Sequence, residues 1–90
     1  MERHFNIVIW GKVQGVGFRE GIKKKATEFR IRGYVKNLPN GTVFIEAEGE
    51  EEQLNKLINW CHNGPSKSEV TSVKYSVAQT QNFEGFEVKD

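Results

Sequence analysis

A glycine-rich stretch at residues 11–19, Gly-Lys-Val-Gln-Gly-Val-Gly-Phe-Arg, most constrains what this 90-residue chain can fold into. An alternating apolar run precedes the stretch and a helical pattern follows it, so the chain turns there from a strand into a helix. Its glycines tolerate positive φ and let the backbone approach a ligand closely. Successive amides in such a turn, beside the unpaired N–H groups of a helix start, attract an anion.

Arg19 ends this stretch with a planar, permanently charged guanidinium that matches the oxygens of a phosphate. We therefore expect an oxyanion cradle here, with a phosphoryl group as its foremost ligand. A plain strand-to-helix turn stays open as the alternative on residue types alone, because glycine-rich turns of this kind are common and arginine opens many helices.

Apolar periodicity divides the rest of the chain into strands and helices. Apolar residues three and four positions apart predict two amphipathic helices, and alternation predicts the strands. A strong hairpin signal lies at residues 38–41, because Asn40 and Gly41 accept the positive φ of tight turns. The expected helices are 19–30 and 50–62, and the expected strands are 5–10, 33–37, 42–48, 70–77 and 86–88.

The order of these elements predicts an α+β, ferredoxin-like fold with the split β-α-β arrangement, in a single domain over residues 1–90. A right-handed crossover makes the first two strands parallel, and the hairpin places the third strand between them, antiparallel to both. We therefore expect an antiparallel sheet, extended by a short terminal strand, with two helices on one face. This topology brings Asn37, at the end of the second strand, close to Arg19.

Composition excludes several classes of function. A formal net charge of +1 provides no broad basic surface for nucleic acid or anionic lipid, so an anion site must be local. The lysines at 23–25 fit a solvated helix face. No apolar run is long enough to span a bilayer. A single cysteine, Cys61, lies on the apolar stripe of the second helix, which excludes an internal disulfide and favours a reducing, cytoplasmic location.

The residues that commonly bind metals are scattered. The acidic run at 50–52 lies in the first turn of a helix, where the helix dipole already favours anions. Cys61 and His62 are adjacent on a helix and diverge, and His4 is distant from both in sequence. We therefore expect neither a metal nor a cofactor.

Arg19 and Asn37 would together form an anion clamp and a water positioner, with no obvious acid or base. A carboxamide donates and accepts hydrogen bonds but is no general base at neutral pH. Phosphoryl transfer depends mainly on positioning and charge stabilisation, so such a site works when the leaving group departs without a proton. A carboxylate does so, because the pKa of its conjugate acid is about 4. The pair therefore favours mixed anhydrides over ordinary phosphate esters.

Two blocks of the sequence resemble the signatures of the acylphosphatase family. The first is Val13-Gln14-Gly15-Val16-Gly17-Phe18-Arg19, and the second is Gly33-Tyr34-Val35-Lys36-Asn37, followed by Gly41, Val43 and Gly49. Trp60 and Gly64-Pro65 also resemble the end of the family's second helix. The blocks occur in the expected order, and the resemblance spans nearly the whole chain.

This resemblance implies hydrolysis of acyl phosphates to a carboxylate and inorganic phosphate, without metal or cofactor. It implies that Arg19 binds the phosphate and that Asn37 orients the attacking water. The implied cradle consists of the backbone amides of Gln14, Gly15, Val16, Gly17 and Phe18. The expected partner is a small acyl phosphate, not nucleic acid or a membrane, and we expect a monomer.

Three positions depart from the family's usual pattern. Asn40 stands where many relatives carry Asp, and we expect little effect because this is a turn position. Gly21 should weaken the start of the helix by up to about 1 kcal/mol relative to alanine. Glu20 is a candidate competitor for the guanidinium of Arg19, which bears on substrate affinity.

Two other functions stay open on the same fold. An RNA-binding module would present aromatics such as Phe44 and Trp10 on the open sheet face, but the Lys/Arg-Gly-Phe-x-Phe block of RNA-recognition motifs is absent. A phosphate-binding regulatory module would hold the anion without turnover. Incubation with benzoyl phosphate separates this module from an enzyme, since a binder releases no product.

Overall fold

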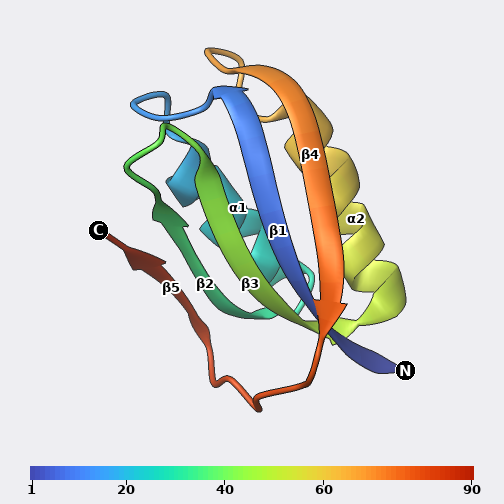
Figure 1. Cartoon of the computed structure of the whole chain (residues 1–90). Coiled ribbons are helices and arrows are strands. Elements are labelled where there is room, and N and C mark those ends of the chain that lie inside the picture. Colours follow the sequence, from blue (N-terminus) through green and yellow to red (C-terminus); the bar gives the residue numbers. More distant parts are fainter.

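Two helices pack against one face of a five-stranded sheet in the computed structural model, which describes residues 1–90 (Figure 1). The elements in chain order are β1 (Glu2–Lys12), α1 (Phe18–Glu28), β2 (Arg32–Asn37), β3 (Val43–Glu50), α2 (Glu51–Asn63), β4 (Glu69–Ala78) and β5 (Phe86–Lys89). Every element expected from the periodicity is present, and the largest difference in bounds is at β1, which is longer at both ends. Neither helix is long and apolar enough to cross a bilayer.

The sheet has the strand order β4-β1-β3-β2-β5. β3 lies between β1 and β2 and is antiparallel to both, as a right-handed crossover followed by a hairpin predicts. β5 pairs parallel with β2 and forms the edge of the sheet. This arrangement confirms the ferredoxin-like fold, and it places the loop after β1 and the end of β2 at the same end of the sheet (Figure 1).

The core fills the space between the sheet and the helices. Its strand residues are the alternate positions that the pattern predicts, for example Ile7, Ile9 and Ile45, which are fully buried. The helices contribute their predicted stripes, which are Phe18, Ile22 and Ala26 from α1 and Leu54, Leu57, Ile58 and Cys61 from α2. Burial of these side chains is the main driving force that holds the helices on the sheet.

β4 is the edge where this core ends. Val73, Tyr75 and Val77 pair with core-facing residues of β1, so they share one face as the alternation predicts. Tyr75 and Val77 are nevertheless more than half exposed, and the Tyr75 ring stacks on Phe5 with 4.7 Å between the ring centroids. Alternation predicted the face of these residues correctly, but it does not predict burial at the edge of a sheet.

Gly21 allows α1 and α2 to pack closely. A Cβ added at Gly21 would lie 2.6 Å from Cη2 of Trp60, so the indole occupies the space that any other side chain would need. The same indole meets the ring of Phe18 edge-on, with 5.5 Å between the centroids. The expectation that Gly21 only weakens α1 is therefore incomplete, because the missing side chain is what lets the two helices touch.

Gly11 belongs to the sheet and not to the anion loop. The register of β1 with β4 shifts between Trp10 and Gly11, and Gly11 has a φ of +123°. A Cβ there would lie 2.1 Å from the carbonyl oxygen of Glu69, so the strand pairing requires glycine. The connection between β1 and α1 is therefore residues 13–17, here called the cradle loop, which is shorter than the stretch singled out from the sequence.

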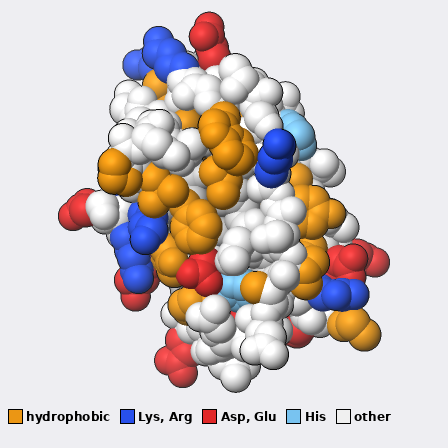
Figure 2. All heavy atoms as spheres, in the orientation of Figure 1, with side chains coloured by type: hydrophobic (Ala, Val, Ile, Leu, Met, Phe, Trp, Pro, Cys, Tyr) orange, Lys and Arg blue, Asp and Glu red, His pale blue; other side chains and the backbone are white.

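The other face of the sheet carries no helix, and hydrophobic side chains gather along its middle (Figure 2). The segment between β4 and β5 packs on one end of this face, where the ring of Phe83 meets the ring of Tyr34 with 5.9 Å between the centroids. The rings of Trp10 and Phe44 lie outside this contact, beside the ammonium groups of Lys74 and Lys36 respectively.

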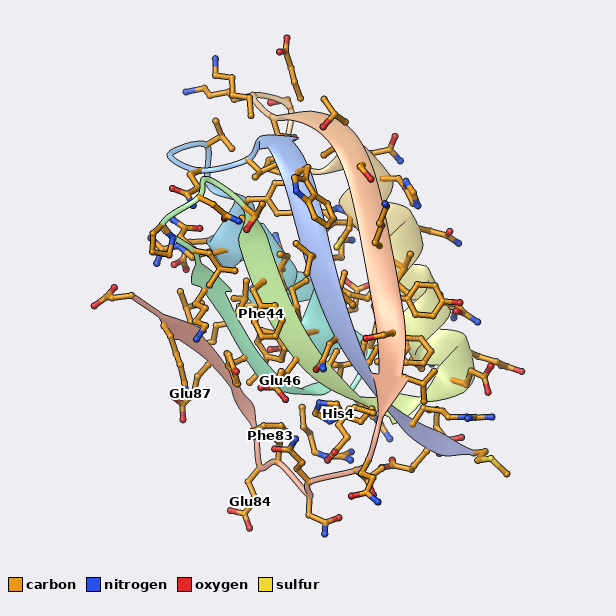
Figure 3. All side chains as sticks on the ribbon, viewed as in Figure 1. His4, Phe44, Glu46, Phe83, Glu84 and Glu87 are labelled. Carbon is orange, nitrogen blue, oxygen red and sulfur yellow. The ribbon has the colours of Figure 1, made fainter.

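His4 is fully buried between two carboxylates on this face, beside Phe83 (Figure 3). Its Nδ1 lies 2.8 Å from Oε2 of Glu48, and its Nε2 lies 2.9 Å from Oε1 of Glu46. The imidazole thus bridges the two carboxyl groups, one at each ring nitrogen. Nothing in the sequence pattern indicates this cluster, because the partners of His4 are far along the chain.

Glu48 holds the segment between β4 and β5 onto the sheet. Its carboxylate accepts hydrogen bonds from the backbone N–H groups of Gln81 and Phe83, the latter at 3.0 Å. Burial alone would raise the pKa of Glu48, but the hydrogen bonds from Gln81, His4 and Phe83 outweigh burial and hold that pKa below its usual value. The buried carboxylate thus favours its ionised form.

Candidate active site

The cradle loop bends through two glycines in the left-handed region. Gly15 has a φ of +72° and Gly17 a φ of +81°, and a Cβ at either position would meet no atom within 4 Å. Glycine is therefore required here by backbone conformation and not by crowding. The backbone N–H groups of residues 14–17 donate to no other group of the protein, so they are available to a ligand.

A small cavity of about 90 Å³, here called the loop hollow, opens beside this bend. It is lined by Val13, Gly15, Gly17, Phe18, Arg19, Glu20 and Asn37. Arg19 and Asn37 are eighteen positions apart in the sequence, and they meet here because β1 and β2 end at the same end of the sheet. The juxtaposition expected from the topology is therefore present.

The guanidinium of Arg19 is oriented by the C-terminal strand. Its Nη1 donates to the carbonyl oxygen of Lys89 at 2.8 Å and lies 3.9 Å from Oδ1 of Asp90. Its other N–H groups make no hydrogen bond within the protein, which leaves donors for an anion. Glu20 lines the loop hollow but forms no ion pair with Arg19, and the one carboxylate within 4 Å of the guanidinium is that of the exposed Asp90.

Asn37 is the last residue of β2, paired in register with Val43 of β3. Its Oδ1 is buried and has no hydrogen-bond partner. A buried acceptor without a partner lowers the stability of the fold by about 1–3 kcal/mol. The unpaired oxygen of Asn37 therefore needs an explanation. Because Asn37 lines the loop hollow, a hydrogen-bond donor held there is the candidate partner for this oxygen.

Gln14 and Val16 contribute to the cradle loop in a way that their types alone did not reveal. Neither is among the residues that line the loop hollow, and Val16 packs against the core. The Gln14 carboxamide donates instead to two carbonyl oxygens of the β2–β3 turn, those of Leu38 and Thr42. Only the backbone of Gln14 was expected to matter, and nothing in the sequence pattern points to this contact.

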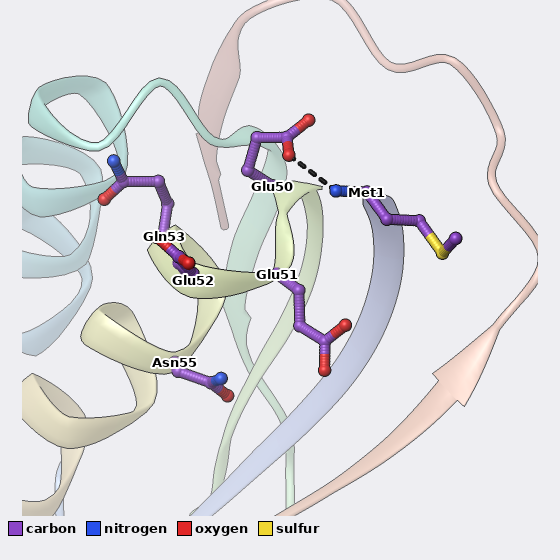
Figure 4. A pocket seen from close by; sticks show the side chains of 6 residues that line it. All are labelled: Met1, Glu50, Glu51, Glu52, Gln53 and Asn55. Atoms are coloured by element: carbon purple, nitrogen blue, oxygen red, sulfur yellow. Dashed lines mark hydrogen bonds and ion pairs between the residues drawn. The ribbon is translucent and has the colours of Figure 1, made fainter.

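The largest hollow of the molecule lies elsewhere and is acidic. Its volume is about 510 Å³, and its lining is Met1, Glu50, Glu51, Glu52, Gln53 and Asn55 (Figure 4). The N-terminal ammonium lies 2.7 Å from Glu50 and Nε of Arg3 lies 3.4 Å from Glu51, which leaves Glu52 without a cationic partner. Like charges would repel a phosphate there, so this hollow is no candidate for an anion site.

Cys61 is not a candidate nucleophile. Its side chain is fully buried in the stripe of α2, as the sequence pattern predicts. Burial raises the pKa of the thiol to about 12, so the reactive thiolate is not formed at neutral pH. Cys61 therefore supplies no nucleophile, and the polar groups at the loop hollow are Arg19, Glu20, Asn37 and the free amides.

Comparison with known proteins shows which family the sequence and the fold belong to. The sequence model of the acylphosphatase family matches residues 5–88. An acylphosphatase from Archaeoglobus fulgidus is 46% identical over 82 residues, which cover 91% of this chain and 92% of that protein. An acylphosphatase from Thermococcus kodakarensis is 42% identical over 80 residues, which cover 89% of this chain and 88% of that protein. A solved acylphosphatase structure from Coxiella burnetii has a TM-score of 0.94 at 36% identity and covers 98% of this chain and 93% of its own. The chain belongs to the acylphosphatase family of enzymes.

Proposed function

We propose that this protein hydrolyses the carboxyl–phosphate bond of small acyl phosphates by direct attack of water on phosphorus. The observation that carries the proposal is the meeting of Arg19, Asn37 and unpaired loop amides around one hollow. Membership of the acylphosphatase family supports the substrate class. The proposed products are a carboxylate and inorganic phosphate.

The phosphate would lie in the cradle loop, with its oxygens toward the N–H groups of residues 14–18 and the guanidinium of Arg19. Charge-assisted hydrogen bonds from a guanidinium and from amides at a helix start are strong, and they persist as charge shifts in the transition state. The loop is already bent through Gly15 and Gly17, so little reorganisation is needed when the substrate binds.

Asn37 would orient the attacking water through its buried Oδ1, which has no partner within the protein. The water oxygen attacks phosphorus, the bond from phosphorus to the acyl oxygen breaks, and the electron pair leaves with the carboxylate. The water's proton passes to an oxygen of the substrate's own phosphate. No protein acid is required, because the leaving carboxylate is the conjugate base of an acid with a pKa of about 4.

A hydrolysis assay tests this proposal. Benzoyl phosphate and acetyl phosphate should be hydrolysed far faster than in buffer, whereas p-nitrophenyl phosphate, a monoester with a poorer leaving group, should react much more slowly. Addition of EDTA should leave the rates unchanged. Phosphate binding without release of benzoate would overturn the proposal and favour a regulatory module without turnover.

A further inference from the structure

The side chain of Gln14 joins two parts of the active site that no strand pairing joins. Its Nε2 lies 2.8 Å from the carbonyl oxygen of Leu38 and 2.9 Å from that of Thr42. These are the only hydrogen bonds between the cradle loop and residues 37–42. β1 and β2 cannot supply such bonds, because β3 lies between them in the sheet.

The turn that receives these bonds is closed within itself. The Leu38 N–H donates to the Thr42 carbonyl at 2.9 Å, and the Gly41 N–H donates to the Leu38 carbonyl at 3.1 Å. Oδ1 of Asn40 accepts from the N–H and the hydroxyl of Thr42, at 3.1 Å and 2.6 Å. A turn braced in this way moves as one unit, so a bond to its two ends sets the position of the whole turn.

Asn37 immediately precedes this turn, and Arg19 follows the cradle loop within the first turn of α1. A shift of the turn relative to the loop would therefore change the distance between the Asn37 carboxamide and a phosphate held at Arg19. In this arrangement one side-chain nitrogen with two N–H donors satisfies both carbonyls. Glutamine has this nitrogen, whereas glutamate and methionine have no donor.

We propose that Gln14 is a positioning residue, whose side chain clamps the β2–β3 turn to the cradle loop and so sets Asn37 against the bound phosphate. The kinetic part of this inference rests on the proposed hydrolysis of acyl phosphates. The clamp itself is a structural claim, and it is testable without turnover.

Gln14→Met tests the clamp, because methionine has nearly the same length and no donor. Loss of alignment should lower kcat by roughly 10- to 100-fold, the size expected for a displacement of about 1 Å. The inhibition constant of inorganic phosphate should stay close to that of the unaltered protein, because Arg19 and the loop amides remain. Gln79→Met is the matched control, since Gln79 is exposed and outside the site, and its kcat should not change.

A double-mutant cycle separates positioning from a general loss of stability. If Gln14 acts through Asn37, Gln14→Met should cause no further loss of kcat in the Asn37→Ala background. The inference would be overturned if the losses of kcat in the two single variants multiply in the double variant. It would also be overturned if Gln14→Met has a lower melting temperature but a normal kcat when folded.

Heteronuclear NMR provides the readout that does not depend on activity. The side-chain amide resonances of Asn37 should shift in Gln14→Met and stay in place in Gln79→Met, and amide exchange in the turn should accelerate only in the former. An Asn37 resonance that is unmoved in Gln14→Met would overturn the clamp, whatever the activity. If the unaltered protein hydrolyses no acyl phosphate but the Asn37 resonances still shift in Gln14→Met, only the proposed hydrolysis is overturned and the clamp stands.

Discussion

Arg19 and Asn37 differ in the physical effect that each contributes to the proposed reaction. Arg19 carries a full charge, which attracts the phosphate in the bound state and in the transition state alike. Asn37 carries only a dipole, and in the proposed reaction its buried oxygen, which has no partner within the protein, would act on the water and not on the anion. Substitution of the two residues should therefore give different kinetic results.

Asn37→Ala should lower kcat by roughly 10²- to 10³-fold, the usual effect of removing one positioned hydrogen-bonding group. Inhibition by inorganic phosphate should be nearly unchanged, because the cradle is intact. Arg19→Ala should abolish turnover and phosphate binding together. Steady-state kinetics with phosphate as a competitive inhibitor measure both quantities, and a near-normal kcat in Asn37→Ala would show that another group orients the water.

Glu20 is the single carboxylate in the lining of the loop hollow, so its role needs a separate test. Glu20→Gln should lower KM by about two- to fivefold, the scale of a solvent-screened charge, with kcat nearly unchanged. This difference should shrink as salt rises. A large fall in kcat, together with loss of one limb of the pH–rate profile, would instead identify Glu20 as a general base.

A guanidinium after a glycine turn and a carboxamide at a strand end are visible in the sequence, and the predicted topology was enough to bring Arg19 and Asn37 together, as the structure does. They did not reveal the clamp of Gln14 or the burial of His4. The partners of Gln14 are main-chain carbonyls 24 and 28 positions away, and a carbonyl has no sequence signature. The partners of His4 are 42 and 44 positions away.

The two helices show how one contact can reverse a propensity argument. Helix propensity alone predicts that alanine at position 21 is better than glycine by up to about 1 kcal/mol. The indole of Trp60 occupies the space of that side chain and packs on Phe18, so alanine would force the indole out of its place. The element was predicted correctly, but the reason for its glycine lies on the other helix.

Gly21→Ala should lower the free energy of unfolding by about 1–3 kcal/mol, the usual cost of overpacking. Urea denaturation measures this change. In a Trp60→Leu background the same substitution should be neutral or stabilising, because the obstructing ring is gone. Stabilisation by Gly21→Ala in the otherwise unaltered protein would show that the helices are free to separate.

For the molecule as a whole, the order of the helices and strands, read from the spacing of apolar residues, was enough to predict the topology. A right-handed crossover and a tight hairpin leave one arrangement for the first three strands, and the structure has it. The packing of the segment between β4 and β5 on the helix-free face of the sheet could not be predicted in the same way. It depends on His4, Glu46 and Glu48 meeting a segment near the C-terminus, and no local pattern encodes that meeting.

This cluster makes the stability of the whole fold depend on pH. The pKa of Glu48 is lowered in the folded state, so its stabilising contribution is present above the ordinary value of 4.5 and is lost as the pH falls through the folded-state pKa. The urea midpoint should therefore fall from about pH 6 to about pH 3, and more steeply than in Glu48→Gln. Glu84→Gln, which removes an exposed carboxylate of the same segment, should keep the steep dependence. Equal slopes in the unaltered protein and Glu48→Gln would exclude this role of Glu48.

The fate of oxygen from water tests direct attack on phosphorus most directly. Benzoyl phosphate is hydrolysed by the protein in ¹⁸O-labelled water, and both products are analysed by mass spectrometry. Attack by a water aimed from Asn37 at a phosphate held by Arg19 predicts one labelled oxygen in the phosphate and none in the benzoate. Label in the benzoate would mean that water attacks the carbonyl carbon, which contradicts the mechanism proposed for the loop hollow.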